Sequence, residues 1–229
     1  MENELVNQAL PQVSLLENTL VVSFPQVCRA VSWAPLGGGV TLTQHWINHQ
    51  VQESRVLCEV KESPAKSLRR AARNLGLSGN IVGQMTSGDV REFKEAVLTE
   101  KDWTVFCAGT AGFSNAVRAG EAAAHDSQKA GTINLLVWIS KPLALPTLLE
   151  ILQIATEART LAVLELKVKS QATGAPATGT GTDCITVACP EPRKKVVPRE
   201  KAQRVYAGKH TILGELVGKT VLRVMGVSE

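Results

Sequence analysis

The residues best suited to chemistry occupy one short stretch, residues 177–183, of sequence Ala-Thr-Gly-Thr-Gly-Thr-Asp. Its glycines permit positive φ angles and close backbone approach, and its three threonines supply hydroxyl donors and acceptors. Backbone N–H groups exposed in such a turn can form a nest for an anion. A P-loop would need Gly-Lys-Ser/Thr opening into a helix, which is absent. The stretch is therefore either a flexible turn or a polar site, and it precedes a predicted strand at 184–188.

Two further turns carry polar groups beside predicted strands. A strand over 104–110 leads from Thr110 into the sequence Ala-Gly-Phe-Ser-Asn-Ala-Val-Arg, in which Arg118 lies four residues past Ser114. The sequence Gly-Thr-Ile-Asn at 131–134 opens another strand, predicted over 133–139. A strand that stops at a Gly/Ser/Asn turn is a suitable place for polar chemistry, because loops held by a rigid sheet carry many binding residues.

Two other groups of ionisable residues stand out. Glu157 and Arg159 fall within the longest predicted helix, 146–166, which is apolar nearly all round. Such a helix is buried on more than one side, so we expect Glu157 to have a cationic partner or a catalytic task. His45 and His49 are spaced for one helical face, but the Glu of a zinc H-E-x-x-H motif is missing. We expect a solvated or substrate-facing pair and no metal site.

Composition narrows the class of protein. The 229 residues are 44% hydrophobic and 20% charged, as in an ordinary globular protein. The net charge of +4 comes largely from residues 193–204, and nine aromatic residues are too few for nucleic-acid stacking platforms. Five cysteines without a C-x-x-C pair argue against disulfides and favour a cytoplasmic protein. No signal peptide or membrane span is visible.

The elements that must position these residues indicate an α+β fold. Hairpins are predicted over 13–24 and 93–110, with strands at 30–33 and 81–86 and helices at 63–74 and near the C-terminus. We expect a mostly antiparallel sheet packed against a long buried central helix and flanking helices, in a single domain over 1–229. Residues 190–205 are predicted to form an exposed basic loop, and the glycines at 37–39 a structural turn.

Five stretches, in this order, resemble the adenosylcobinamide amidohydrolase family of corrinoid salvage. The stretches are residues 110–120, 131–134, 155–158, 177–183 and 207–218, and with the glycines at 37–39 the resemblance covers about Ala30 to the C-terminus. Arg159 stands where the family usually has Lys, which keeps the charge. The resemblance implies hydrolysis of the amide that joins aminopropanol to the corrin ring's propionyl arm, with adenosylcobyric acid as product. It implies a small-molecule corrinoid partner, no nucleic acid or membrane partner, and no cofactor beyond the cobalt within the substrate.

Amide hydrolysis needs an activated nucleophile, donors for the oxyanion and an acid for the leaving amine. In the preferred scheme the acid–base residues acting on water are Glu157, Asp183 and His210. The substrate or the oxyanion would be held by Thr110, Ser114, Asn115, Arg118, Asn134, Thr178, Thr180 and Thr182.

Alternative schemes remain open. Residues 112–116 nearly spell the G-x-S-x-G elbow, and Ser114, Asp183 and His210 follow hydrolase chain order. A threonine nucleophile would need a liberated N-terminal Thr or a neighbouring base, and nothing marks a cleavage site. An amidohydrolase of another amide and a non-catalytic corrinoid carrier are the other functional classes. The D-x-H-x-x-G motif of a cobalt-ligating carrier is absent, and the oligomeric state is left open.

Overall fold

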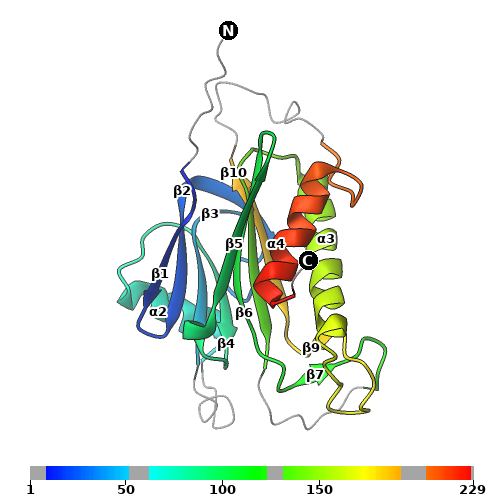
Figure 1. The fold of residues 1–229 in the computed structure, drawn as a ribbon. Helices are drawn as coiled ribbons and strands as arrows, with labels where there is room; N and C mark the ends of the chain where they lie inside the picture. Colours follow the sequence, from blue (N-terminus) through cyan, green and yellow to red (C-terminus); the bar gives the residue numbers. More distant parts are fainter. Residues whose placement is uncertain (1–8, 52–61, 123–130, 192–204, 228–229) are drawn as a thin grey trace.

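The computed structural model describes residues 9–51, 62–122, 131–191 and 205–227 (Figure 1). The described strands are β1 (Gln12–Leu16), β2 (Thr19–Ser32), β3 (Gly39–Gln50), β4 (Ile81–Thr86), β5 (Lys94–Glu100), β6 (Trp103–Ala111), β7 (Ala116–Val117), β8 (Ile133–Ile139), β9 (Gly179–Thr180) and β10 (Cys184–Pro190). The described helices are α2 (Pro64–Asn74), α3 (Leu145–Glu165) and α4 (Ile212–Met225), with a 3₁₀ turn η1 (Val90–Glu92).

Eight of the strands form one mixed sheet in the order β4-β3-β2-β10-β8-β6-β5, with β1 added beside β2. Its pairs are antiparallel except for β3–β4 and β8–β10. The register between β2 and β3 shifts between Ser23 and Cys28. The first half of β2 pairs with β1 and its second half with β10, so the bulged strand joins two parts of the sheet.

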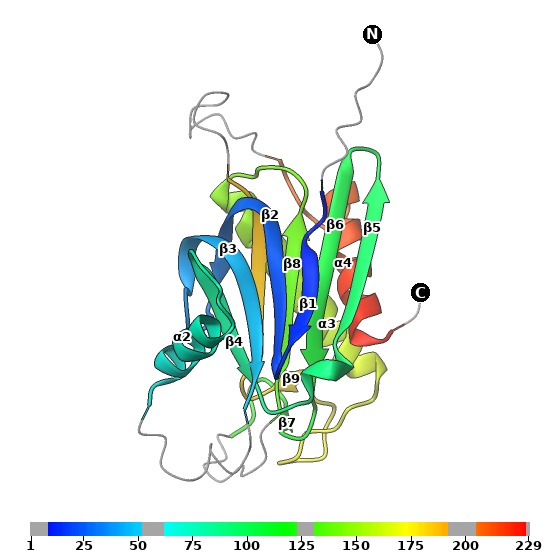
Figure 2. The same cartoon turned by 90° about the vertical axis from the view of Figure 1, so that its left-hand side faces the viewer.

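These two parts of the sheet pack against each other face to face. Phe106 and Trp138, from β6 and β8, share a buried apolar cluster with Leu20, Val22 and Trp46 from β2 and β3. Hydrogen bonds also join strands that are not neighbours in the sheet, such as Gln84 on β4 with Thr186 on β10. The sheet therefore folds back on itself, and β1–β4 form one layer over a second layer of β5, β6, β8 and β10 (Figure 2).

Helices cover both outer faces of this double layer. On β8, Ile133, Leu135, Val137 and Ile139 all point toward α3 and α4, because alternate residues of a strand face the same way. The other layer is covered by α2, which buries Leu68 and Ala72 against β2 and β3. The resulting order of layers is α3/α4, sheet, sheet, α2 (Figures 1 and 2).

Most predicted elements are confirmed, including the α+β class, the hairpin of β5 and β6, and the strand β8. The strand expected at 30–33 is the second half of β2, because the bulge lets one strand continue past its bend. The burial expected of the long helix is only partly met. α3 lies on one face of the sheet, and its outer side leaves Leu149 and Leu161 exposed.

His45 and His49 lie on β3 rather than on a helix. Residues i and i+4 lie on the same face of a helix and also on the same face of a strand, so the spacing of the two histidines did not distinguish a helix from a strand. His45 Nδ1 lies 2.9 Å from Ser23 Oγ and His49 Nδ1 lies 2.8 Å from Thr19 Oγ1, on the side of β3 that faces α2. The glycine turn at 37–39 is structural as predicted, since a Cβ on Gly37 would lie 2.5 Å from the Ile81 carbonyl oxygen. The predicted basic loop falls mainly on 192–204, outside the described residues.

Candidate active site

The predicted polar turns meet at one end of the sheet. There β8 and β10, which are parallel neighbours, begin, and β6 ends. The small strands β7 and β9 pair Ala116 with Thr180, which brings the turn containing Ser114 and Asn115 beside the Gly/Thr stretch. The amide N–H of Thr178 also donates to the Val117 carbonyl at 3.0 Å. The expectation that polar turns from distant parts of the chain converge is confirmed for these three turns.

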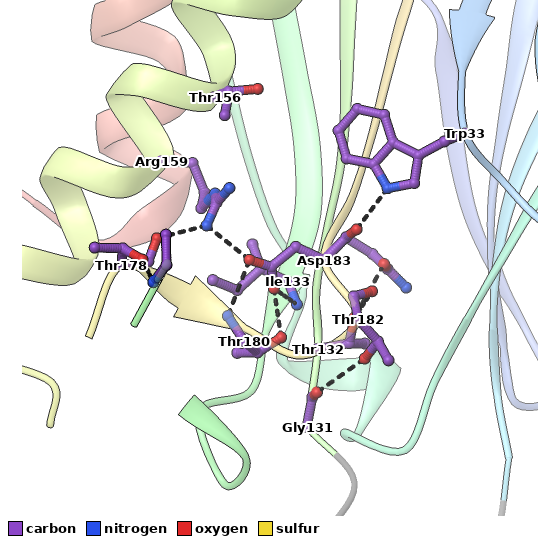
Figure 3. A network of polar contacts seen from close by, with 12 residues as sticks. Trp33, Gly131, Thr132, Ile133, Thr156, Arg159, Thr178, Thr180, Thr182 and Asp183 are labelled. Carbon is purple, nitrogen blue, oxygen red and sulfur yellow. Dashed lines mark hydrogen bonds and ion pairs between the residues drawn. The ribbon is translucent and has the colours of Figure 1, made fainter. Parts of the chain in front are cut away.

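Asp183 is the centre of the hydrogen-bond network at this end (Figure 3). Its carboxylate accepts from the Ile133 N–H at 3.2 Å, from Arg159 Nη1 at 2.7 Å and from the Thr180 N–H at 3.0 Å, and the Thr180 hydroxyl donates to it as well. Arg159 Nη1 also donates to the Thr178 carbonyl at 2.7 Å. A carboxylate has about four acceptor positions. Asp183 is therefore fully bonded, and it ties α3 and β8 to the Gly/Thr stretch.

Gly179 is required by this arrangement. A Cβ at this position would lie 2.0 Å from Arg159 Nη1 and 2.3 Å from Asp183 Oδ2. Gly131 is similarly confined, because its Cβ would lie 2.6 Å from Ser114 Oγ. The glycines in these turns thus allow close approach of charged and polar side chains to the backbone, as in many ligand-binding loops.

A second set of contacts fixes the neighbouring backbone. The Thr132 hydroxyl donates to the Thr182 carbonyl at 2.7 Å, and the Thr182 hydroxyl donates to the Gly131 carbonyl at 3.2 Å. The indole N–H of Trp33 donates to the Asp183 carbonyl at 2.7 Å, and the residue as a whole is 49% exposed. The sequence analysis did not identify Trp33 or Thr132. The triple glycine just after Trp33 is the signal that could have drawn attention to this segment.

Asn115 differs from its neighbours. Its side chain is only 8% exposed, yet Oδ1 has no hydrogen-bond partner among the described residues. Ser114 and Thr182, on either side of it, are exposed. Two exposed residues that carry hydroxyl groups, near a buried amide oxygen without a partner, form an arrangement that can receive a polar ligand.

Two of the predicted substrate-binding residues lie inside the molecule instead. Asn134 Nδ2 donates to Asn48 Oδ1 at 2.8 Å and to the Met85 carbonyl at 2.7 Å, and Asn48 Nδ2 donates to Thr110 Oγ1 at 2.9 Å. Thr110 and Asn134 are 6% and 1% exposed. They therefore join the two sheet layers beneath the site. The sequence analysis missed Asn48, a polar residue that directly follows the apolar residues Trp46 and Ile47 on β3.

Two more predicted residues bond to the protein's own backbone. Arg118 Nη1 donates to the Pro176 carbonyl at 3.0 Å. Thr178 Oγ1 accepts from the Ala119 N–H at 2.8 Å. The two side chains hold the turn after β7 against the segment before β9. Arg118 and Thr178 are therefore part of the framework that supports the site.

Glu157 and His210 lie away from this network. Glu157 is paired with Lys209 and also accepts from Gln153 Nε2 at 3.1 Å, and its side chain is 41% exposed. The expected cationic partner is confirmed, whereas the expected burial is wrong, because Glu157 is on the outer side of α3. The hydrogen bond from Lys209, together with that from Gln153, lowers the pKa of the Glu157 carboxyl.

His210 is exposed, and no described hydrogen bond joins it to Glu157 or Asp183. The structure thus assembles neither the predicted trio nor the Ser114–His210–Asp183 triad.

The described residues contain no group of three or more His, Cys, Asp and Glu side chains placed to hold a metal ion. The thiols of Cys28, Cys184 and Cys189 are buried, which raises their pKa to about 12, about 11 and about 11. Buried thiols with raised pKa are poor nucleophiles at neutral pH. Within the described part of the chain, none of the helices has the length and apolar character needed to cross a membrane.

The chain matches the family model of adenosylcobinamide amidohydrolase over residues 4–227. It belongs to the adenosylcobinamide amidohydrolase family. The resemblance carried by the five sequence stretches is therefore confirmed across almost the whole length. In this family member, the stretches 110–120, 131–134 and 177–183 are the three turns that meet at the end of β8 and β10. A search of curated proteins finds no match.

Two solved structures are similar to this family member at low sequence identity. The PH0078 protein from Pyrococcus horikoshii OT3 has a TM-score of 0.44 and 9% identity, over 95% of this chain and 79% of that one. The L-aminopeptidase D-Ala-esterase/amidase from Ochrobactrum anthropi, described as a new variant among the Ntn hydrolase fold, has a TM-score of 0.43 and 8% identity, over 94% of this chain and 81% of that one. At this level of similarity, neither likeness bears on the activity.

Proposed function

We propose that the protein hydrolyses the amide between aminopropanol and the propionyl arm of adenosylcobinamide, giving adenosylcobyric acid that re-enters cobalamin synthesis. The observation that carries this proposal is the family match over residues 4–227, within which three motif turns meet at one end of the sheet. In the reaction, water adds to the carbonyl carbon and the C–N bond breaks. The nitrogen leaves as the amine of aminopropanol after taking up a proton.

The site proposed for this step is the end of the sheet around Asn115. The exposed residues Ser114 and Thr182 are assigned the role of donating to the oxygen of the scissile carbonyl, where negative charge develops in the transition state. The Thr182 hydroxyl would exchange its present bond to the Gly131 carbonyl for this one. The exposed indole of Trp33, fixed by its hydrogen bond to the Asp183 carbonyl, offers a flat apolar surface for the corrin ring.

Asp183 is assigned a positioning role in this proposal. Its carboxylate already accepts four hydrogen bonds, including two from Thr180, so no acceptor position is left for an attacking water. It instead holds the Gly/Thr stretch against α3 through Arg159. Loss of this anchor would move Thr182 away from Ser114, and small displacements of positioned groups cost large factors in rate.

The acid–base roles of Glu157 and His210 remain predictions. For them to act, the leaving amine would have to reach the outer side of α3, where Lys209 pairs with Glu157. A carboxylate with a lowered pKa is also a weak base near neutral pH. We therefore place the reaction at the end of the sheet, and the variants that separate the two locations are described in the Discussion.

The activity is tested by incubating the purified protein with adenosylcobinamide and chromatographing the mixture. Release of aminopropanol and adenosylcobyric acid in equal amounts supports the proposal. A coloured protein–corrinoid complex that never releases amine would instead indicate a non-catalytic carrier. Dialysis against EDTA before the assay tests the prediction that the only cobalt involved is that of the substrate. Release of amine from other amides, but none from adenosylcobinamide, would indicate another amidohydrolase.

A further inference from the structure

The side-chain amide of Asn115 is not used by the fold. Asn115 is 8% exposed, and its buried Oδ1 has no hydrogen-bond partner among the described residues. Burying an amide without a partner is unfavourable, and native proteins seldom tolerate it without a functional reason. A residue kept only to stabilise the turn would be expected to bond to the adjacent backbone, as Thr178 does when its Oγ1 accepts from the Ala119 N–H.

The neighbours of Asn115 leave it free rather than paired. A Cβ on Gly131 would lie 3.0 Å from Oδ1 and one on Gly181 would lie 3.6 Å from Nδ2, so glycines flank both amide atoms. Two hydroxyl groups of the Gly/Thr stretch already donate elsewhere, that of Thr182 to the Gly131 carbonyl and that of Thr180 to Asp183.

We propose that Asn115 binds a carboxamide group of the corrinoid, a specificity contact that rests on the proposed function. An asparagine amide offers one acceptor and one donor face, and only a ligand group that has both can satisfy it fully. A carboxamide has both, whereas a carboxylate only accepts and an ammonium group only donates. The amide of Asn115 therefore discriminates between corrinoids whose arm at this position is a carboxamide and those in which it is a free acid.

Two variants of Asn115 test this contact. Asn115→Leu has nearly the same volume and no polar atom, so the proposal predicts an unchanged or higher melting temperature together with corrinoid binding weakened about tenfold or more. Asn115→Asp keeps the shape and the acceptor but loses the donor, and it should also weaken binding of the amide-bearing corrinoid. Binding of the product is measured by equilibrium dialysis, and binding of the substrate by rapid gel filtration in the cold before appreciable hydrolysis, with the visible absorbance of the corrinoid as the readout.

The carboxamide could be the scissile amide or one of the other arms, and the product distinguishes them. Adenosylcobyric acid lacks the scissile amide but keeps the primary carboxamides. If Asn115→Leu weakens the binding of substrate and product alike, Asn115 contacts a primary carboxamide. If it weakens the binding of substrate only, Asn115 contacts the scissile amide. Either result supports the proposal.

Three results would overturn the inference about Asn115. One is that Asn115→Leu binds both corrinoids as the unaltered protein does, and another is that the unaltered protein binds neither. The third is that both variants lose folding cooperativity in urea, which would make Asn115 a structural residue. Failure of the proposed function alone would give a different result from failure of the Asn115 contact. The unaltered protein would then bind adenosylcobinamide, Asn115→Leu would bind it more weakly, and neither would release aminopropanol.

Discussion

Arg159 Nη1 lies 2.7 Å from Asp183 Oδ2, and this ion pair joins the longest helix to the stretch richest in functional groups. Both side chains are nearly buried, at 11% and 9% exposure. Because Arg159 Nη1 also holds the Thr178 carbonyl, one guanidinium group positions both ends of the turn that precedes β10. The stability of α3 packing and the geometry of the site are therefore linked through a single residue.

Replacing Arg159 by Met should unfold the protein more easily, because Asp183 would be left buried without its counter-charge. Breaking one side of a buried pair costs about 3–5 kcal/mol, and we expect a loss near the lower figure in urea unfolding. Arg159→Lys, which keeps the charge, should cost less. Lys209→Met is the matched control on the exposed pair with Glu157 and should change stability little. Equal stability of Arg159→Met and the unaltered protein would show that the pair does not anchor the loop.

Gly179→Ala should destabilise the protein by about 1–3 kcal/mol, because the added methyl group would collide with Arg159 and Asp183. Gly218→Ala is the matched control, since a Cβ on this α4 residue meets no described atom within 4 Å. It should stabilise the protein by roughly 0.5–1 kcal/mol through helix propensity. Both free energies are measured by urea unfolding, and a stabilising Gly179→Ala would contradict the packing described.

Stability should fall as the pH drops below the ordinary histidine pKa of 6.5. Burial lowers the pKa of His45 and His49 in the folded protein, and the positive charge of Arg70 lowers that of His49 further, against a smaller opposing effect of Glu17. Below pH 6.5 the unfolded chain thus binds more protons than the folded one, and protonation favours unfolding. The urea midpoint should decrease between about pH 7.5 and about pH 5.5.

The control for this pH dependence is the double variant His45→Gln/His49→Gln. Its urea midpoint should vary less over the same interval, because the carboxyl groups with lowered pKa titrate below their ordinary values near 4.5. A slope as steep as that of the unaltered protein would assign the effect to other groups.

The described thiols should be unreactive in the folded protein. Burial raises the pKa of Cys28 to about 12 and of Cys184 and Cys189 to about 11, and it raises the pKa of Cys107 as well. Because Cys58 lies outside the described residues, the test uses Cys58→Ser. Ellman's reagent should label this variant only after denaturation. Rapid labelling of the native variant, with loss of aminopropanol release, would point to a thiol nucleophile.

Local patterns predict the elements of this fold well, and contacts between elements poorly. The spacing of apolar residues places β8 at residues 133–139, as observed, because its burial on both faces leaves a continuous apolar run. The outer side of α3 carries Leu149, Leu161 and Leu164, so composition alone made the helix look buried all round. Nothing local to Asn48 or Gln84 shows that the sheet folds back to place them opposite Asn134 and Thr186.

The same limit applies to the site. The turns at 110–120, 131–134 and 177–183 were recognisable because their Gly, Ser, Thr and Asn residues form motifs within short windows. The ion-pair partner of Asp183 could not be recognised in this way, because Arg159 lies 24 positions earlier in the chain, on a different element. Glu157, only two positions from Arg159, faces the opposite way, and helical geometry alone separates their environments.

The central claim is that the amide is broken at the end of the sheet, and two double variants test it most directly. Aminopropanol release from adenosylcobinamide is measured for Ser114→Ala/Thr182→Val and for Glu157→Gln/His210→Ala, beside the unaltered protein. We predict that the first loses about 100-fold or more in kcat, as expected when oxyanion donors are removed, and that the second stays close to the unaltered rate. Loss of activity in the second pair, with the first unaffected, would contradict the account.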